Sequence, residues 1–242
     1  MKTDISDFHN TQSGRCWIVG NGSSLNSTPL EEIQEPTFGM NSIHLICDKT
    51  TWRPTYYTNF KRKGSIEVIQ KTIQPVLELG VPCIVNSRYA PVNVESWFPK
   101  GYFDNLYALS YAHIDFRNPN EFDWMENPYW VFGYGTGTYA SCQIACWMGF
   151  EEIIFVGHDM NWRGWDISGD TNHFAKNYSE GFSEPLNEEQ AFHIGKRMLT
   201  SHEAIKARCE ERGVKVFNAT IGGELEVYPR VDFYEVCHSG NK

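Results

Sequence analysis

Short apolar runs rich in β-branched and aromatic residues recur along the chain, separated by longer stretches with helical periodicity. Side chains of these types fit a buried, pleated surface, so the runs predict strands. They are residues 16–20, 55–60, 82–86, 152–157 and 214–219. The longer stretches, 64–80, 137–149 and 187–213, predict helices, and each closes on a glycine, where helices usually end.

This alternation predicts an α/β fold of the Rossmann-like, doubly wound type, with a mainly parallel sheet covered on both faces. The 242 residues, 41% of them hydrophobic, fit one domain spanning 1–242. Residues 88–130 break the rhythm, being rich in Pro, Asn and aromatic residues without a steady period. We predict that they form an aromatic-rich insertion or lid over the binding site.

Composition narrows the classes of function. A net charge of −9 opposes binding to nucleic acid, and the basic cluster at residues 60–64 predicts a solvated loop, with phosphate contact as the alternative. No run approaches the roughly 18 apolar residues of a membrane span, and the first 15 residues lack the apolar core of a signal peptide, so a cytoplasmic protein is predicted. Seven dispersed cysteines, an odd number, predict free buried thiols.

The first predicted strand runs directly into a glycine turn, "WIVGNGSSLN", at residues 17–26. In parallel α/β sheets, ligands bind beyond the carboxyl ends of the strands. Gly20 and Gly22 permit a close backbone approach, while Asn21 and Ser23 offer neutral hydrogen bonds. The turn lacks the Gly-Lys-Ser/Thr ending of a Walker A loop and the full GxGxxG pattern, so it predicts either a ligand turn or a plain strand-ending turn.

Two further segments point to the same edge of the sheet. The loop "GYGTGTYAS", residues 133–141, places the Thr136 and Thr138 hydroxyls and backbone amides at a helix N-terminus, a natural seat for phosphate or carboxylate. His158 and Asp159 follow the strand predicted at 152–157. The convergence of the three segments predicts a nucleotide-type ligand.

In order, the motifs "WIVGNGSSL", "TFGMNS", "YYTNF" and "GTGTYASCQIACWMGFEEIIFVGHDMNW" resemble those of glycosyltransferase family 42, the bacterial sialyltransferases. They equally resemble the related motility-accessory-factor domain, to which the tail motifs "TNHFAKNY" and "VKVFNATIGGELEVYPRVDF" are more similar. The resemblance covers most of residues 16–233 and is thin over 88–130. It implies transfer of an acidic, sialic-acid-type sugar from a CMP-activated donor to a hydroxyl of a glycan or other acceptor, without a metal cofactor.

Carried over by position, the resemblance implies that the CMP-sugar is surrounded by Asn21, Asn41 and Asn59. It also implies that the loop at residues 136–138 holds the nucleotide and the sugar carboxylate. Glycine stands at 137, where the family has serine. With Gly22 and Ser23 of the first turn, the predicted substrate-binding residues are Asn21, Gly22, Ser23, Asn41, Asn59, Thr136, Gly137, Thr138 and Asp159.

The sequence departs from the family where the departing phosphate and the general base are expected. Asn161, Trp162 and Trp165 occupy the region of two phosphate-binding tyrosines, and Asn177 occupies the position of the base. His173 is the substitute candidate for the base, because an imidazole titrates near neutrality; a role in ordering the loop is the alternative. His158 is the second catalytic candidate, with a structural or substrate-orienting role as its alternative.

The sequence also allows alternative hypotheses on a metal site, on the function and on the oligomeric state. No Asp-x-Asp triplet occurs, although Asp159, Asp166 and Asp170 could supply oxygen ligands to a metal. The second hypothesis for the function, beside the glycosyltransferase, is an enzyme that resembles the pterin diphosphokinases of the same fold group and uses ATP and magnesium. A non-catalytic nucleotide-binding domain is the third alternative. The sequence does not determine the oligomeric state, and a homo-oligomer is one of the alternatives.

Overall fold

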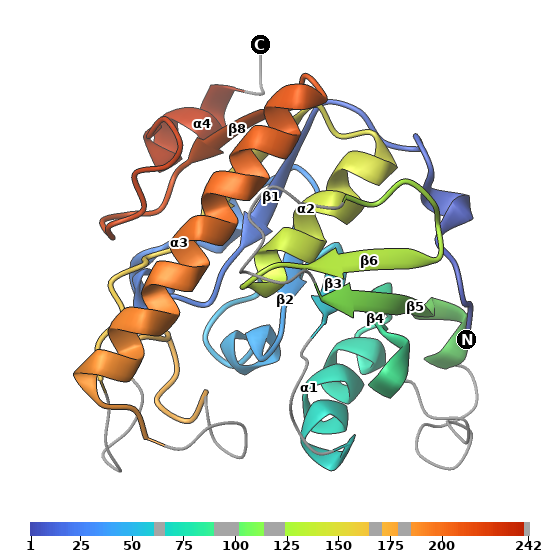
Figure 1. Ribbon diagram of the computed structural model, residues 1–242, viewed down its shortest axis with the longest axis horizontal. Coiled ribbons are helices and arrows are strands. Elements are labelled where there is room, and N and C mark those ends of the chain that lie inside the picture. Colours follow the sequence, from blue (N-terminus) through green and yellow to red (C-terminus); the bar gives the residue numbers. More distant parts are fainter. Residues whose placement is uncertain (61–65, 90–101, 114–123, 165–170, 179–184, 240–242) are drawn as a thin grey trace.

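An eight-stranded sheet, with every neighbouring pair of strands parallel, forms the centre of the protein (Figure 1). The computed structural model describes residues 1–60, 66–89, 102–113, 124–164, 171–178 and 185–239. Across the sheet the strands lie in the order β6 (Trp130–Gly133), β5 (Leu106–His113), β4 (Cys83–Asn86), β3 (Tyr56–Asn59), β2 (Thr37–Met40), β1 (Arg15–Val19), β7 (Glu152–Val156) and β8 (Lys215–Asn218).

Helices cover both faces of the sheet, and alternating side chains of each strand face the two layers. Cys16 and Ile18 of β1 pack in the core that includes side chains of α2 (Gly137–Met148) and α3 (Glu188–Glu211). Trp17 and Val19 pack in the opposite core, with side chains of α1 (Ile66–Glu78) and α4 (Phe233–Ser239). This arrangement confirms the predicted α/β, doubly wound fold.

The five predicted strands and three predicted helices are all present, with ends shifted by one or two residues. Gly149 closes α2 at a φ of 99°, a left-handed conformation that glycine adopts without steric cost. Asn187 and Gln190 form a capping box at the start of α3. All seven cysteines are free, as predicted, and five of them are buried, whereas Cys47 and Cys146 are partly exposed.

The prediction of an insertion or lid over 88–130 is wrong for residues 106–113, which form strand β5 of the central sheet. Three strands, β2, β5 and β6, were not predicted from the sequence. The sequence of β5, "LYALSYAH", mixes helix-favouring Leu and Ala with strand-favouring Tyr, so its periodicity is weak. Residues 90–101 and 114–123 lie outside the described residues, as does most of the basic cluster, 61–64. A lid role for the remainder of 88–130 stays a prediction.

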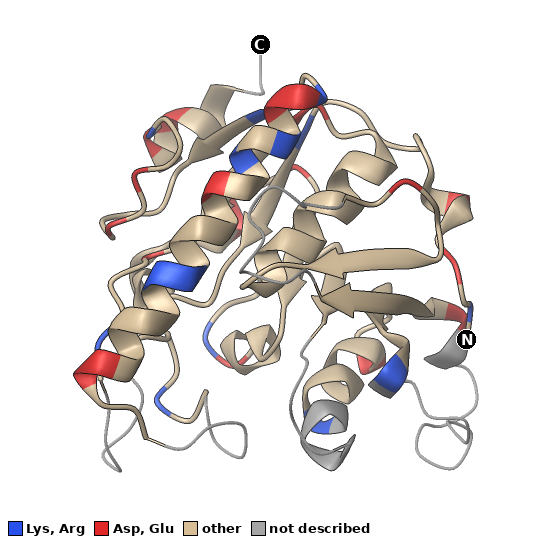
Figure 2. Ribbon diagram, viewed as in Figure 1, with Lys and Arg blue, Asp and Glu red and all other residues tan. Residues whose placement is uncertain are grey.

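Charged side chains of both signs follow one another along α3, whereas β5 and β6 carry none (Figure 2). Such a distribution is typical of a helix with one solvated face beside a buried sheet. Within the described ranges, no helix combines the length and the apolar character needed to cross a bilayer.

The order of the strands sets the place of the site. From β1 the chain winds outward through β2 to β6, and it then returns to the other side of β1 to form β7 and β8. In open α/β sheets a crevice forms beyond the carboxyl ends of the strands where the winding reverses. Here that switch point lies between β1 and β7.

Candidate functional site

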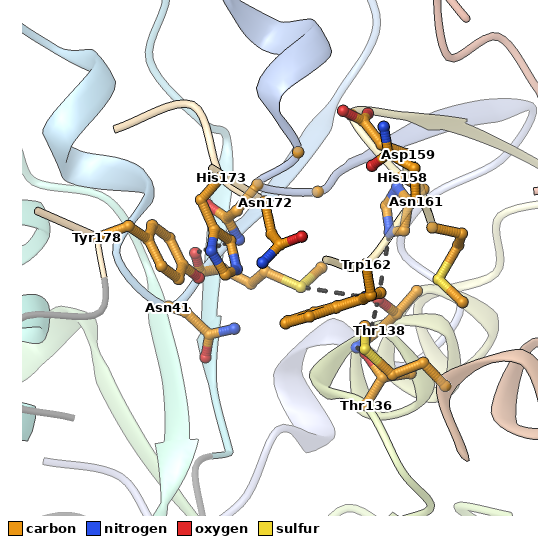
Figure 3. Close-up of a pocket in the computed structure, with 17 residues that line it drawn as sticks. Asn41, Thr136, Thr138, His158, Asp159, Asn161, Trp162, Asn172, His173 and Tyr178 are labelled. Carbon is orange, nitrogen blue, oxygen red and sulfur yellow. Dashed lines mark hydrogen bonds between the residues drawn. The ribbon is translucent and has the colours of Figure 1, made fainter. Parts of the chain in front are cut away.

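A cavity opens at the switch point, beyond the ends of β1, β2 and β7 (Figure 3). The N-terminus of α2, the loop after β7 and the segment at 172–178 complete its wall. Both catalytic candidates, His158 and His173, line it. Of the predicted substrate-binding residues, those that line it are Asn21, Gly22, Asn41, Thr136, Thr138 and Asp159.

The glycine turn after β1 is a tight junction with the end of β7. The Gly22 amide donates to the Gly157 carbonyl at 2.8 Å. A Cβ atom on Gly20 would overlap the Gly157 carbonyl oxygen, and one on Gly22 would overlap the Asp159 carboxylate. Both glycines are therefore required by the close approach of two loops, which places the Asn21 side chain in the cavity.

Asp159 joins these two loops through its side chain. Its carboxylate accepts hydrogen bonds from the Ser24 amide at 2.8 Å, from the Ser23 hydroxyl at 3.1 Å and from the Ser24 hydroxyl. It thereby caps the short 3₁₀ helix Ser23–Ser27, where a negative charge is favoured by the exposed amides. Although Asp159 lines the cavity, much of its bonding capacity is used to hold the glycine turn in place.

We predict that Gly22→Ala lowers the free energy of unfolding by about 1–3 kcal/mol, the usual cost of forcing an extra methyl group into a packed site. The reason is that the new methyl group would displace the Asp159 carboxylate from Ser23 and Ser24. Chemical denaturation of the variant measures the change. Gly137→Ala is the matched control, because its Cβ would meet the nearest atom, Asn41 Nδ2, at an ordinary 3.6 Å. Equal stability of the two variants would contradict the prediction.

Two asparagines present amide groups at the ends of β1 and β2. The Asn21 side chain donates to the Met40 carbonyl at 3.3 Å, and its Oδ1 is buried without a hydrogen-bond partner among the described residues. A buried acceptor left unpaired costs free energy, so such an atom calls for a donor from elsewhere. Asn41 adopts a left-handed backbone conformation with φ of 53°, which is uncommon outside glycine and occurs disproportionately at functional sites.

A chain of hydrogen bonds runs from the N-terminus of α2 to the end of β7. Thr136 caps α2, and its hydroxyl donates to that of Thr138 at 3.2 Å. Thr138 Oγ1 lies 3.2 Å from His158 Nε2, and His158 Nδ1 lies 3.1 Å from the Val156 carbonyl. Since a carbonyl only accepts, Nδ1 carries the proton and Nε2 accepts from Thr138.

Burial lowers the pKa of His158 to about 4, so the imidazole is neutral at pH 7. Its two ring nitrogens are both engaged, with Thr138 and with the Val156 carbonyl. This geometry suits a residue that orients the Thr138 hydroxyl. His173, the other catalytic candidate, lines the same cavity from the segment at 172–178.

His173 reaches the cavity on a segment that folds back over the glycine turn. Its backbone forms a β-bridge with Gly22, and the Phe174 amide donates to the Asn21 carbonyl at 3.1 Å. The His173 ring stacks on Tyr178, with centroids 3.8 Å apart and an interplanar angle of 11°. Trp162 meets the His173 ring edge-on at 5.5 Å, and its indole lies across the middle of the cavity (Figure 3).

Three predicted residues lie outside the lining. The Ser23 hydroxyl donates to Asp159, and Gly137 begins α2, where a Cβ atom would lie 3.6 Å from Asn41 Nδ2. The Asn59 side chain is 1% exposed and donates to Tyr57 Oη and Thr72 Oγ1, both at 3.0 Å. These contacts fasten α1 to β3 and place Asn59 away from the cavity.

Several residues that line the cavity were not predicted from the sequence, among them Met160, Asn172, Tyr178 and Met198. Asn172 holds the loop after β7 closed, because its side chain pairs with both the amide and the carbonyl of Arg163. Asn172 and Tyr178 lie close to His173 in the sequence, so they could have been predicted as cavity residues from their proximity to that candidate. Met198 lies in the middle of α3, and no local pattern marks it.

The cavity holds about 90 Å³, below the roughly 300–1,000 Å³ of pockets that enclose a small organic ligand. A nucleotide would therefore have to displace the Trp162 indole.

We predict that nucleotide binding changes the tryptophan fluorescence of the protein and that Trp162→Phe removes this change. Trp147→Phe, on the far end of α2, is the control, because Trp147 donates to the Ile5 carbonyl and lies outside the lining. A signal that survives in Trp162→Phe would contradict the prediction.

The charge of the lining bears on the ligand. Asp159 is the one Asp, Glu, Lys or Arg among the described lining residues. Within the described residues, no group of three or more His, Cys, Asp or Glu side chains is placed to hold a metal ion. Asp166 and Asp170, the other acids considered as metal ligands, lie outside them. An anionic group in this cavity would be held by amides and neutral side chains.

Comparison with known proteins adds evidence on the fold. No family model and no curated protein sequence matches the chain. Its fold is similar to that of a solved protein. This is the MAf glycosyltransferase from Magnetospirillum magneticum AMB-1, with a TM-score of 0.54 and 14% sequence identity over 95% of this chain. The chain spans 35% of the length of that protein, and at this identity the similarity establishes a shared fold.

Proposed function

We propose that the protein is a glycosyltransferase whose donor site is the cavity at the switch point. The donor is a CMP-activated acidic sugar of the sialic-acid type, and the acceptor is a hydroxyl group. The observation that carries the proposal is the buried Oδ1 of Asn21, which lines this cavity without a partner among the described residues. The similarity of fold to a glycosyltransferase supports the choice of reaction.

In this proposal the chain recognises its donor through neutral hydrogen bonds. Asn21 Oδ1 accepts from an N–H or O–H of the nucleotide or sugar, and the Asn41 amide contributes from the end of the neighbouring strand. The N-terminus of α2 at Thr136 faces the phosphate or the sugar carboxylate, where its amides and dipole favour negative charge. His173 takes the proton of the attacking hydroxyl as the bond to the anomeric carbon forms.

We propose that the reaction proceeds without a metal ion bound by the residues of the cavity. Breaking the bond between the anomeric carbon and the phosphate oxygen leaves CMP with an added negative charge. Amides preorganised at the start of α2 stabilise charge at this position without a cation. We therefore expect turnover to persist in a chelator.

The experiment that tests the reaction follows release of CMP from a CMP-activated sialic acid in EDTA, with water or a sialylated glycan as acceptor. CMP release above the uncatalysed rate supports the proposal. Thermal-shift measurements with CMP, UDP and ATP, each with and without magnesium, distinguish the alternatives. Stabilisation by ATP and magnesium alone would favour the diphosphokinase reaction, and no stabilisation by any of them would favour a domain without nucleotide chemistry.

We predict that Asn21→Ala weakens CMP binding by about 1–3 kcal/mol, because a ligand donor that reached Oδ1 is left buried and unpaired. Isothermal titration calorimetry measures the affinity. Asn26→Ala is the matched control, because Asn26 is exposed in the 3₁₀ helix that follows the glycine turn and its side chain contacts Lys49. The assignment of Asn21 fails if the two variants bind CMP equally well.

A further inference from the structure

A second cavity lies along the same edge of the sheet, beyond the end of β4. Strand β4 stops at Asn86, which pairs with Leu109, whereas β5 continues through Ser110 to His113 alongside β6. The step between the short and the long strand leaves a cavity of about 380 Å³. This volume is within the range of pockets that hold small organic ligands.

Arg88 supplies a positive charge to this second cavity. It lies in the short 3₁₀ helix Ser87–Tyr89 directly after β4, and its amide donates to Asn86 Oδ1 at 3.0 Å. The described residues provide no hydrogen bond or ion pair to its guanidinium, and no Asp or Glu is among those lining the cavity. Arg15, by contrast, pairs with Glu35 and Glu152. An exposed guanidinium with five donors matches a carboxylate, which it can bind through two parallel hydrogen bonds.

Trp130 supplies an aromatic surface beside this charge. It begins β6, stands in register with Ser110 and is 45% exposed, although tryptophan is usually well buried. An indole presents a flat apolar face with an N–H donor at its edge, so it can contact the C–H face of a sugar ring and still form a hydrogen bond. The hydroxyls of Ser87 and Ser110 add neutral groups suited to sugar hydroxyls.

The wall of the second cavity is built into the sheet. The Tyr111 ring packs against Phe60 with centroids 5.6 Å apart. A Cβ atom on Gly133 would overlap Tyr111 Oη, so glycine at this position is what lets the tyrosine lie across β6. Asn86, Ser110, Tyr111, His113 and Trp130 thus stand on paired strands, and Ser87 and Arg88 follow β4 directly, which favours a preformed site.

We propose that this second cavity binds an acidic saccharide, with Arg88 on the carboxylate and Trp130 against the sugar ring. The cavity at the switch point is about three strand spacings away, or roughly 15 Å, so the two sites can be filled together. If the protein transfers sugars as proposed, a saccharide bound here would form part of an extended acceptor. Only this last step rests on the proposed function; binding of the saccharide does not.

The test uses the full chain, methyl glucuronide as the probe, and a ¹H–¹⁵N NMR titration. The protein has eight tryptophans, and the indole signal of Trp130 is identified by its loss in Trp130→Phe. We expect methyl glucuronide to shift this signal and neutral methyl glucoside to bind about tenfold more weakly. Arg88→Gln should weaken glucuronide binding by about tenfold or more, whereas Arg53→Gln, which alters an exposed arginine remote from this cavity, should not.

The outcomes separate this proposal from the proposed donor site. Glucuronide binding that persists in Asn21→Ala and under saturating CMP supports the second site, even if no sugar transfer is detected. Absence of a shift in the Trp130 signal, equal affinity for the glucoside, or unchanged affinity in Arg88→Gln would each overturn it. Loss of glucuronide binding in Asn21→Ala would also overturn it, because the probe would then occupy the donor site.

Discussion

Replacing His173 with asparagine is expected to lower the rate of sugar transfer by about 10²–10⁴-fold while CMP affinity changes little, the usual effect of losing a general base. Asparagine retains hydrogen-bonding groups but cannot take up a proton near neutral pH. The position of His173 supports this role, because its backbone bridges to Gly22 and its ring stands between Trp162 and Tyr178 at the cavity.

Single-turnover rates and CMP affinities of the wild type and His173→Asn make the measurement. His193→Asn is the control, because His193 is exposed on α3 and lies outside the lining. Tyr178→Phe separates proton transfer from stacking, since phenylalanine preserves the aromatic contact with His173. A rate in His173→Asn equal to that of the wild type would remove His173 from the reaction, and equal losses of rate and affinity would assign it to donor binding.

Acidification is expected to cost the protein about 3 kcal/mol of folding free energy through His158 alone. Burial lowers the pKa of His158 from 6.5 to about 4, so between these values the unfolded chain binds a proton that the folded protein does not. Stability is therefore complete above pH 6.5 and is lost as the pH falls toward 4. Burial also lowers the pKa of His202, whose ring lies 5.6 Å from that of His158, and it acts in the same direction.

Denaturant unfolding at several pH values between 7 and 4 measures this loss. His158→Gln removes the titrating group, so the difference in stability between wild type and variant should shrink as the pH falls. Carboxylates contribute to both proteins and cancel in that difference. A difference that does not vary with pH would show that His158 is not held neutral by burial.

The sequence predicted those strands whose composition is unambiguous. The runs at β4 and β7, "CIVN" and "EIIFV", consist mainly of side chains that favour a buried strand, and both were found. Strand β2, "TFGM", has four residues and a central glycine, and β6, "WVFG", ends on one, so neither produces a recognisable period. Their place is decided by pairing with neighbours that are distant in sequence.

The same distinction holds for the candidate site. Gly22 and Asp159 were predicted because each follows a strand, and the carboxyl ends of parallel strands share one edge of the sheet. Asn59 also ends a strand, but β3 lies two strands from β1, and its amide is used to hold α1. Met198 and Tyr178 enter the cavity from α3 and from a returning loop. Such approaches depend on tertiary packing that local periodicity does not encode.

The most direct test of the donor site is a crystal structure of the protein with CMP bound in the presence of a chelator. We expect CMP at the switch point, with a nucleotide donor group on Asn21 Oδ1, the phosphate at the start of α2 near Thr136, and the Trp162 indole displaced. CMP bound elsewhere with Asn21 Oδ1 still unpaired would rule out this donor site, as would a protein that takes up no CMP at saturating concentration.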